Sequence, residues 1–165
     1  MKLIGLLLIV ILSTALGASL YDRDRKKLRT ISLLITLVDE IHTEIRFAGS
    51  TMEEILLGCA ENPIYKPLVF LSHIKKGFVS PSTLRDAIEG SAAEMNFDSY
   101  EMLPLLNMSD KLGTTDIAGQ LQMLEGCKLQ LMELKSTQSN RCDTLGKMYI
   151  SLGLLLGIGT AVILA

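Results

Sequence analysis

The sequence has few of the residues from which enzymes build reactive sites. Its 165 residues include only two histidines and three cysteines, and no tryptophan. His42 lies in the acidic sequence DEIHTE (residues 39–44), but the HExxH spacing of zinc proteases is absent. His73 has no evident partner. A solvated acidic helix face is therefore the favoured interpretation of His42, and no metal site is predicted.

The motifs of nucleotide binding and nucleophilic catalysis are also missing. Gly146 and Lys147 adjoin, but a phosphate loop needs GxxxxGK followed by Ser or Thr. Arg141 occupies the first glycine position and Met148 follows the lysine. No GxSxG sequence occurs, and no set of nucleophile, base and orienting residue can be nominated. We therefore expect no catalytic residue and no cofactor, and a protein that is not an enzyme.

Cysteine pairing and excess charge are lacking too. Cys59, Cys127 and Cys142 are odd in number and form no CxxC motif, so they should be reduced in a cytoplasmic domain. We expect the first two in the core and Cys142 near the membrane. All 18 acidic residues but only 15 of the 16 basic ones lie within residues 22–147. The resulting net charge of about −3 does not suit binding to the phosphates of a nucleic acid, so no nucleic-acid partner is expected.

Two long runs at the ends of the chain lack charge altogether. Leu3–Tyr21 and Tyr149–Ala165 contain no charged residue. As helices they would extend roughly 28 Å and 25 Å, close to the thickness of a bilayer core. We therefore predict transmembrane helices in residues 1–21 and 148–165, around a cytoplasmic domain of residues 22–147.

The basic flank Arg23–Arg29 bears on the fate of the first run. A cleaved signal peptide is the alternative, because Lys2 precedes the run and small residues lie near its end. A basic flank directly after an apolar run disfavours translocation, and Arg141 and Lys147 precede the second run. A membrane anchor is favoured, with the basic flank either meeting anionic lipid headgroups or serving as a topology signal alone.

The residues between the two runs have the apolar spacing of helices. Leu34, Leu37, Val38 and Ile41 lie on one face of a first helix expected at residues 23–47. Further helix starts are expected at Thr51, with Glu54 completing a capping box, and then at Asn62-Pro63, Ser80-Pro81, Ser99 and near Thr115. No strand pattern is evident. The predicted fold is all-α, a cytoplasmic six-helix bundle between N- and C-terminal transmembrane helices.

The sequence LGTTDIAGQ (residues 112–120) could be either a polar site or a joint between two helices. Gly113 suits the left-handed position after a helix end. Thr114 or Thr115 suits the next N-cap, and Asp116 would then lie in the first turn. Each polar residue has a local structural role, so we interpret Leu112, Gly113, Thr115, Asp116 and Gln120 as a structural or interaction motif.

A GxxxG motif, Gly153 and Gly157, lies inside the second apolar run. Small residues at this spacing let helices approach closely in lipid. The motif favours pairing of the two spans with each other or with another membrane protein. A chance match is the alternative, because glycine is frequent in such helices.

The order of these features resembles the stage III sporulation protein AB family of endospore-forming bacteria. The resemblance covers essentially the full chain: an apolar start with a basic flank, a helical middle, LGTTD (Leu112–Asp116) with Gln120, and the terminal LGLLLGIGTAVILA. The family often has a tryptophan near the fourth helix, where this chain has none. The resemblance implies a domain similar to the cytoplasmic six-helix domains of type II secretion and type IV pilus platform proteins.

The resemblance also implies a function. Such a protein would lie in the mother-cell membrane facing the forespore, within a secretion-like channel complex that supports late forespore gene expression. Its partners would be membrane lipids and other stage III sporulation proteins, including the secretion-type ATPase stage III sporulation protein AA. The alternative is a platform component of a general type II secretion or pilus-like system. A membrane enzyme or small transporter is disfavoured, since neither apolar run contains an ionisable residue.

Overall fold

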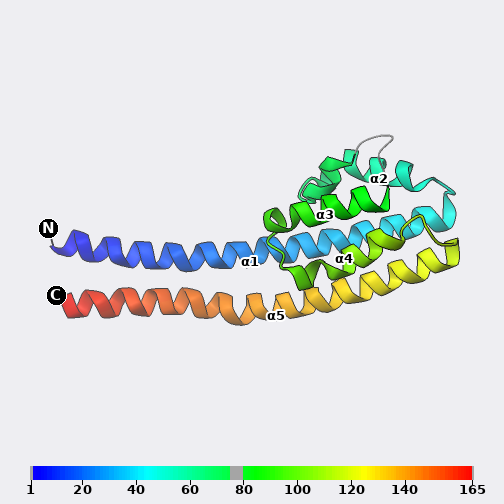
Figure 1. The fold of residues 1–165 in the computed structure, drawn as a ribbon. Helices are drawn as coiled ribbons and strands as arrows, with labels where there is room; N and C mark the ends of the chain where they lie inside the picture. The colour runs from blue at the N-terminus through cyan, green and yellow to red at the C-terminus, as the bar shows by residue number, and fades with distance from the viewer. Residues whose placement is uncertain (1, 75–79, 165) are drawn as a thin grey trace. The chain divides into compact units, whose positions relative to one another are not determined.

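The structure, a computed structural model, describes residues 2–74 and 80–164, with only the backbone for most residues before 18 and after 144. The described residues form five α-helices, two 3₁₀ helices and no strand, as the all-α prediction requires (Figure 1). The α-helices are α1 (Lys2–Phe47), α2 (Met52–Glu61), α3 (Pro81–Met95), α4 (Ser99–Lys111) and α5 (Ile117–Leu164). The 3₁₀ helices are η1 (Pro63–Tyr65) and η2 (Val69–His73).

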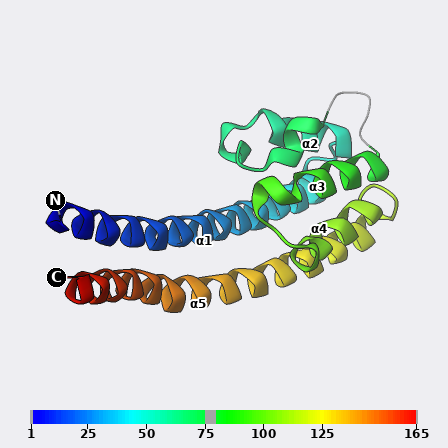
Figure 2. The same ribbon diagram turned by 60° about the vertical axis from the view of Figure 1, so that its left-hand side comes forward.

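The chain divides into two compact units. The end unit contains residues up to Leu28 and from Ser136 onward, and the bundle unit contains Arg29–Lys135. In the end unit, the first part of α1 and the last part of α5 run side by side in opposite directions (Figures 1 and 2). The Gln138 side chain, which is buried, donates from Nε2 to the carbonyl and Oδ1 of Asp24, each at 3.3 Å. This polar contact links the two helices inside the end unit.

The predicted spans stay predictions. Over the described residues, no helix combines the length and the apolar character needed to cross a membrane. Most side chains of residues 1–21 and 148–165 lie outside the described part of the chain. Gly153 and Gly157 fall there as well, so their side of the helix is not described. The polar sequence STQSN (residues 136–140) continues α5 without a break.

The core of the bundle unit follows the spacing of apolar residues along the helices. Leu34, Leu37 and Ile41 of α1 are fully buried, as predicted. They share one cluster with buried residues of every other helix of the unit, among them Leu56, Ile88, Leu105, Leu124 and Leu131. The cysteines Cys59 and Cys127 belong to the same cluster, as predicted, and Cys142 is buried in the end unit.

Three of the helices begin at capping boxes that fix where they start. The Thr51 hydroxyl accepts from the Glu54 amide, and the Glu54 carboxylate accepts from the Thr51 amide at 2.9 Å. Ser80 with Thr83 forms the same reciprocal pair before α3, and Asp98 with Glu101 forms it before α4. The predicted starts of these helices are therefore confirmed.

The third helix expected from Asn62 is wrong: this segment holds only η1 and η2. Asn62 does cap a turn, since its Oδ1 accepts from the Ile64 amide at 3.1 Å and Pro63 follows it. Pro67 then interrupts the helical path, because proline has no amide hydrogen to donate to a carbonyl of the preceding turn. Leu68 has φ −86° and ψ 83°, outside the helical region. The described residues therefore form five α-helices, where six were expected in the cytoplasmic domain.

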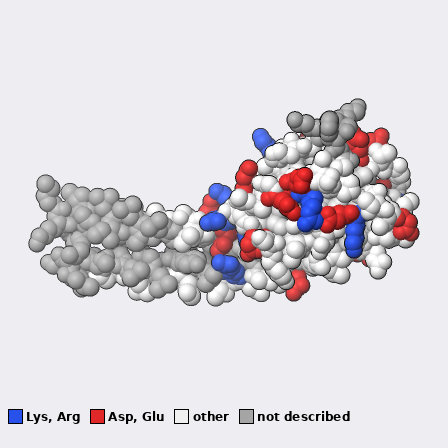
Figure 3. Space-filling model, viewed as in Figure 1, with Lys and Arg blue, Asp and Glu red and all other residues white. Residues whose placement is uncertain are grey.

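Charged residues on the bundle unit are intermixed. Arg85 of α3 pairs with Glu89 in the next turn, at 3.0 Å, and with Asp110 of α4. The face drawn in Figure 3 shows acidic and basic side chains next to one another. Such exposed pairs each contribute little to stability. They nevertheless join α3 to α4 at the surface of the bundle unit, whose shared core contains Ile88 of α3 and Leu105 of α4.

Candidate functional site

The connection between α4 and α5 is formed by LGTTDIAGQ. Leu112 ends α4 in an extended conformation, and its amide donates to the Met108 carbonyl at 3.0 Å. Gly113 follows at φ +76°, the left-handed conformation predicted for it. The Thr114 amide and hydroxyl both donate to the Lys111 carbonyl, at 3.2 and 2.9 Å. The end of α4 is thus satisfied by its own connection.

Asp116 is the N-cap of α5, in place of the predicted Thr114 or Thr115. Its Oδ1 accepts from the Gly119 amide at 3.2 Å, while its carbonyl accepts the first intrahelical bond, from Gln120, at 2.9 Å. The expected cap at Thr114 or Thr115 is therefore wrong, since the Thr114 hydroxyl is already bonded to Lys111 at the end of α4. Aspartate is also a better cap than threonine.

The Gln120 side chain forms hydrogen bonds with two backbone groups of the connection. Its Oε1 accepts from the Gly113 amide at 3.3 Å, and its Nε2 donates to the Thr115 carbonyl at 2.8 Å. The structure therefore brings all five residues of the predicted motif into one hydrogen-bonded connection. Gly119 has a steric role in it, because a Cβ there would lie 2.7 Å from Asp116 Oδ1.

Replacing Asp116 with alanine should lower the free energy of unfolding by about 0.5–2 kcal/mol, the usual cost of losing an N-cap. Asparagine at the same position is the control, since its side-chain oxygen can still accept from Gly119. Urea denaturation of residues 22–147 measures both variants. Equal losses for alanine and asparagine would contradict the capping role.

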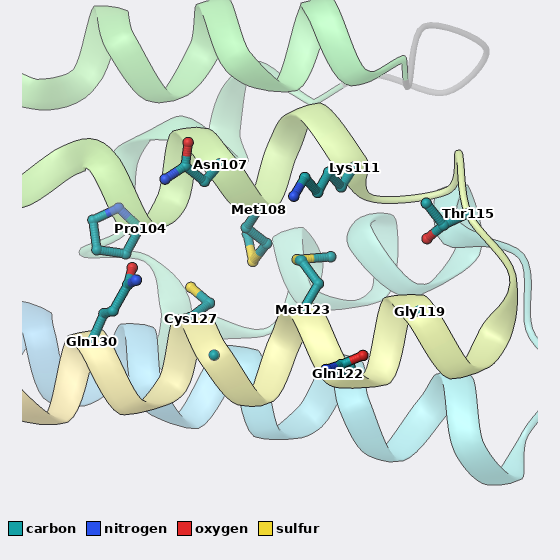
Figure 4. Close-up of a pocket in the computed structure, with 11 residues that line it drawn as sticks. Pro104, Asn107, Met108, Lys111, Thr115, Gly119, Gln122, Met123, Cys127 and Gln130 are labelled. Carbon is teal, nitrogen blue, oxygen red and sulfur yellow. The ribbon is translucent and has the colours of Figure 1, made fainter.

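A groove continues from this connection along α4 and α5. It has a volume of about 640 Å³, and Figure 4 shows residues of α4 facing residues of α5 across it. Its lining combines apolar and small residues with amide side chains and one lysine. The lining consists of Pro104, Asn107, Met108, Lys111, Thr115, Gly119, Gln122, Met123, Gly126, Cys127 and Gln130.

Lys111 is the one charged residue in this lining, and no carboxylate accompanies it. Within the described residues Lys111 forms no ion pair, whereas Lys128, on another face of α5, pairs with Asp39 at 2.7 Å. The groove therefore carries an uncompensated positive charge at the end nearest the α4–α5 connection, as Figure 4 shows.

Gly126 leaves a gap in the α5 wall of the groove. It lies in the interior of a long helix, where glycine costs roughly 0.5–1 kcal/mol relative to alanine. A Cβ added there would meet no atom within 4 Å, so no packing inside the described chain requires glycine. This glycine, which interrupts a good helical pattern, is the one feature of the sequence that could have indicated the groove.

The groove lining includes one buried cysteine, Cys127. Burial raises the pKa of the Cys127 thiol to about 12, which keeps it protonated and poorly nucleophilic near neutral pH. Cys59 likewise has its pKa raised to about 12, by burial and then by the charges of Glu40 and Glu44. The described residues contain no group of His, Cys, Asp and Glu side chains arranged to hold a metal ion.

Polar residues elsewhere in the bundle unit join its helices. The Tyr65 hydroxyl donates to Glu40, which attaches η1 to α1. His42 Nε2 lies 3.8 Å from Glu125 Oε1, so the acidic surroundings of His42 include α5 as well as its own helix. His42 is about one-fifth exposed, which makes it a partly covered surface residue at the contact of α1 with α5.

These features define an all-α protein in which a capped helix connection continues into a groove between α4 and α5. The chain belongs to the stage III sporulation protein AB family, whose model matches residues 2–165. No curated protein matches the chain significantly, and no solved structure does so either.

Proposed function

We propose that this sporulation protein is a non-enzymatic platform subunit of a secretion-like channel complex between mother cell and forespore. Its family membership assigns it to stage III of sporulation. In the proposal, it lies in the mother-cell membrane that faces the forespore, with residues 22–147 in the cytoplasm. There it supports late forespore gene expression.

One observation carries the platform role: the two uncharged runs belong to a single pair of antiparallel helices. The first part of α1 and the last part of α5 lie side by side in the end unit, with the N- and C-terminal ends together (Figures 1 and 2). Two helices arranged in this way can enter one bilayer as a hairpin. The basic residues that follow the first run and precede the second favour the cytoplasm for the bundle unit.

The bundle unit supplies the docking part of the proposal. Its described residues offer a capped connection and a groove in place of a reactive centre, which suits a protein that holds other proteins in position. The proposed partners are other stage III sporulation proteins, including the secretion-type ATPase stage III sporulation protein AA, and the surrounding membrane lipids. No nucleic acid is proposed, since residues 22–147 have a net charge of about −3 and the face drawn in Figure 3 mixes acidic and basic side chains.

Deletion of the gene in its endospore-forming host tests the proposal. Sporulation should stop after engulfment, forespore gene expression should fall at the late stage, and vegetative growth should be normal. Reintroducing the intact gene should restore sporulation. Normal sporulation in the deletion strain would overturn the proposal, and a secretion or pilus defect in growing cells would favour the general secretion platform instead.

A further inference from the structure

The α4–α5 groove has a length that suits the binding of one additional helix. Its α5 wall runs from Gly119 to Gln130, which is about three helical turns, or roughly 16 Å at 1.5 Å per residue. Met108 and Met123 provide an adaptable apolar floor, because methionine side chains repack readily around a partner. The groove thus matches the helix-in-groove mode of recognition.

Gly126 permits an unusually close approach to α5. Its missing side chain is filled by nothing within the described chain, and the residue is exposed. Two exposed apolar residues lie close in sequence to the lining: Leu129, three residues after Gly126 on α5, is 67% exposed, and Tyr100, four residues before Pro104 on α4, is 75% exposed.

The charge of the groove limits what the helix can be. Lys111 forms no ion pair within the described residues, and the lining contains no carboxylate. A second copy using the same groove would bring two lysine-bearing surfaces together, because a two-fold contact places a patch against itself. Charge complementarity therefore favours a different protein whose helix carries an acidic side chain.

We propose that the α4–α5 groove binds an amphipathic helix of a protein partner, whose apolar face packs over Gly126 and Met123 and whose carboxylate pairs with Lys111. This inference deepens the proposed function as a platform subunit and rests on it for the partner's place in the sporulation complex. The groove geometry itself is independent of that function.

Photo-crosslinking of the full chain in sporulating host cells tests the inference. A benzoylphenylalanine introduced in place of Gln130, at the groove rim, should give a light-dependent adduct with one other protein. Mass spectrometry should place the crosslink in an amphipathic helix that contains an acidic residue. The G126L variant, which fills the gap, and the K111E variant, which reverses the charge, should each reduce the adduct at least fivefold.

Matched controls separate docking from folding. Gly90 is likewise an exposed glycine inside a helix with no atom within 4 Å of an added Cβ, so G90L makes the same change outside the groove. Lys135 is an exposed α5 lysine beyond the groove, and K135E controls for charge. Both controls should leave the adduct unchanged. Replacing the partner's acidic residue with lysine should restore the adduct in K111E.

Several results would overturn the inference. These are an adduct with a second copy of the chain or with lipid, no adduct at normal protein levels, and an adduct that neither groove variant weakens. If G126L fails to accumulate, K111E still decides the question, because Lys111 lies on the surface. If gene deletion blocks sporulation but both groove variants sporulate and crosslink normally, the groove inference falls and the proposed function stands.

Discussion

Replacing Leu131 with alanine is expected to lower the free energy of unfolding of residues 22–147 by about 2–5 kcal/mol. Leu131 has no exposed surface and belongs to the cluster that joins α5 to the other helices of the bundle unit. Truncation removes buried apolar contacts and leaves a cavity in a close-packed interior. Urea denaturation followed by circular dichroism measures the loss, on a fragment that we expect to fold as a soluble helical domain.

Leu129 provides a matched control two residues away on the same helix. It is 67% exposed, so alanine there should change stability by no more than about 0.5 kcal/mol. Both variants exchange leucine for alanine in α5, so the helix propensity changes equally and the difference between them isolates burial. Equal losses at the two positions would contradict the packing of α5, and a strand-rich spectrum of the fragment would contradict the fold.

The parts of the fold that the sequence predicts best are those decided by neighbouring residues. A capping box needs two side chains three positions apart, so Thr51 with Glu54 could be recognised from the sequence. The buried face of α1 follows from the helical repeat alone, and Leu34, Leu37 and Ile41 lie where that repeat places them. Both kinds of signal are local.

The errors arise where two local signals compete. Asn62 and Pro63 are good helix starters, yet Pro67 lies four residues further on and the chain forms two short 3₁₀ turns instead. At the start of α5, Thr115 and Asp116 are both acceptable caps, and Asp116, the better of the two, is the one whose side chain accepts from the Gly119 amide. Gln120 then bonds to the Gly113 amide and to the Thr115 carbonyl, a contact across the connection that depends on the folded path of the chain.

The groove could not be predicted, because it depends on how α4 packs against α5. Its lining comes from residues 104–130, and most of them have no distinctive sequence pattern. From the sequence alone, Gly126 is simply an unfavourable residue for the interior of a helix. In the structure, Gly126 lies at an open point of the groove wall. Glycine lowers helix stability there, but its missing side chain would let the proposed partner helix approach α5 closely.

Raising the pH from about 9 to about 12 should progressively destabilise the bundle unit. Burial raises the pKa of the Cys127 thiol to about 12 from its ordinary value of 9.0, and burial with nearby carboxylates does the same for Cys59. Tyr65 also has a raised pKa, because it is buried and its hydroxyl donates to Glu40. The folded protein therefore keeps protons that the unfolded chain releases in this range.

The sign of the effect follows from this difference in bound protons. Below about pH 9 the thiols are protonated in both states, and their full contribution to stability is present. Above it the unfolded chain ionises first, so the free energy of unfolding falls by up to about 1.4 kcal/mol per pH unit for each such group. The fall levels off once the folded state also ionises.

The Cys127→Ala variant identifies one of these groups. It should be less stable than the unaltered fragment near neutral pH, because a buried side chain is truncated, but its stability should fall less steeply between about pH 9 and 12. Urea denaturation at a series of pH values measures the slope, and Leu129→Ala, which removes no ionisable group, should keep the original slope. Parallel curves for Cys127→Ala and the unaltered fragment would show that the Cys127 thiol ionises as readily in the folded protein as in the unfolded chain. The reactivity of Cys127 provides an independent measurement. Its thiol should react slowly with iodoacetamide at neutral pH, because it is buried and protonated, and the reaction should become faster when the fragment is unfolded.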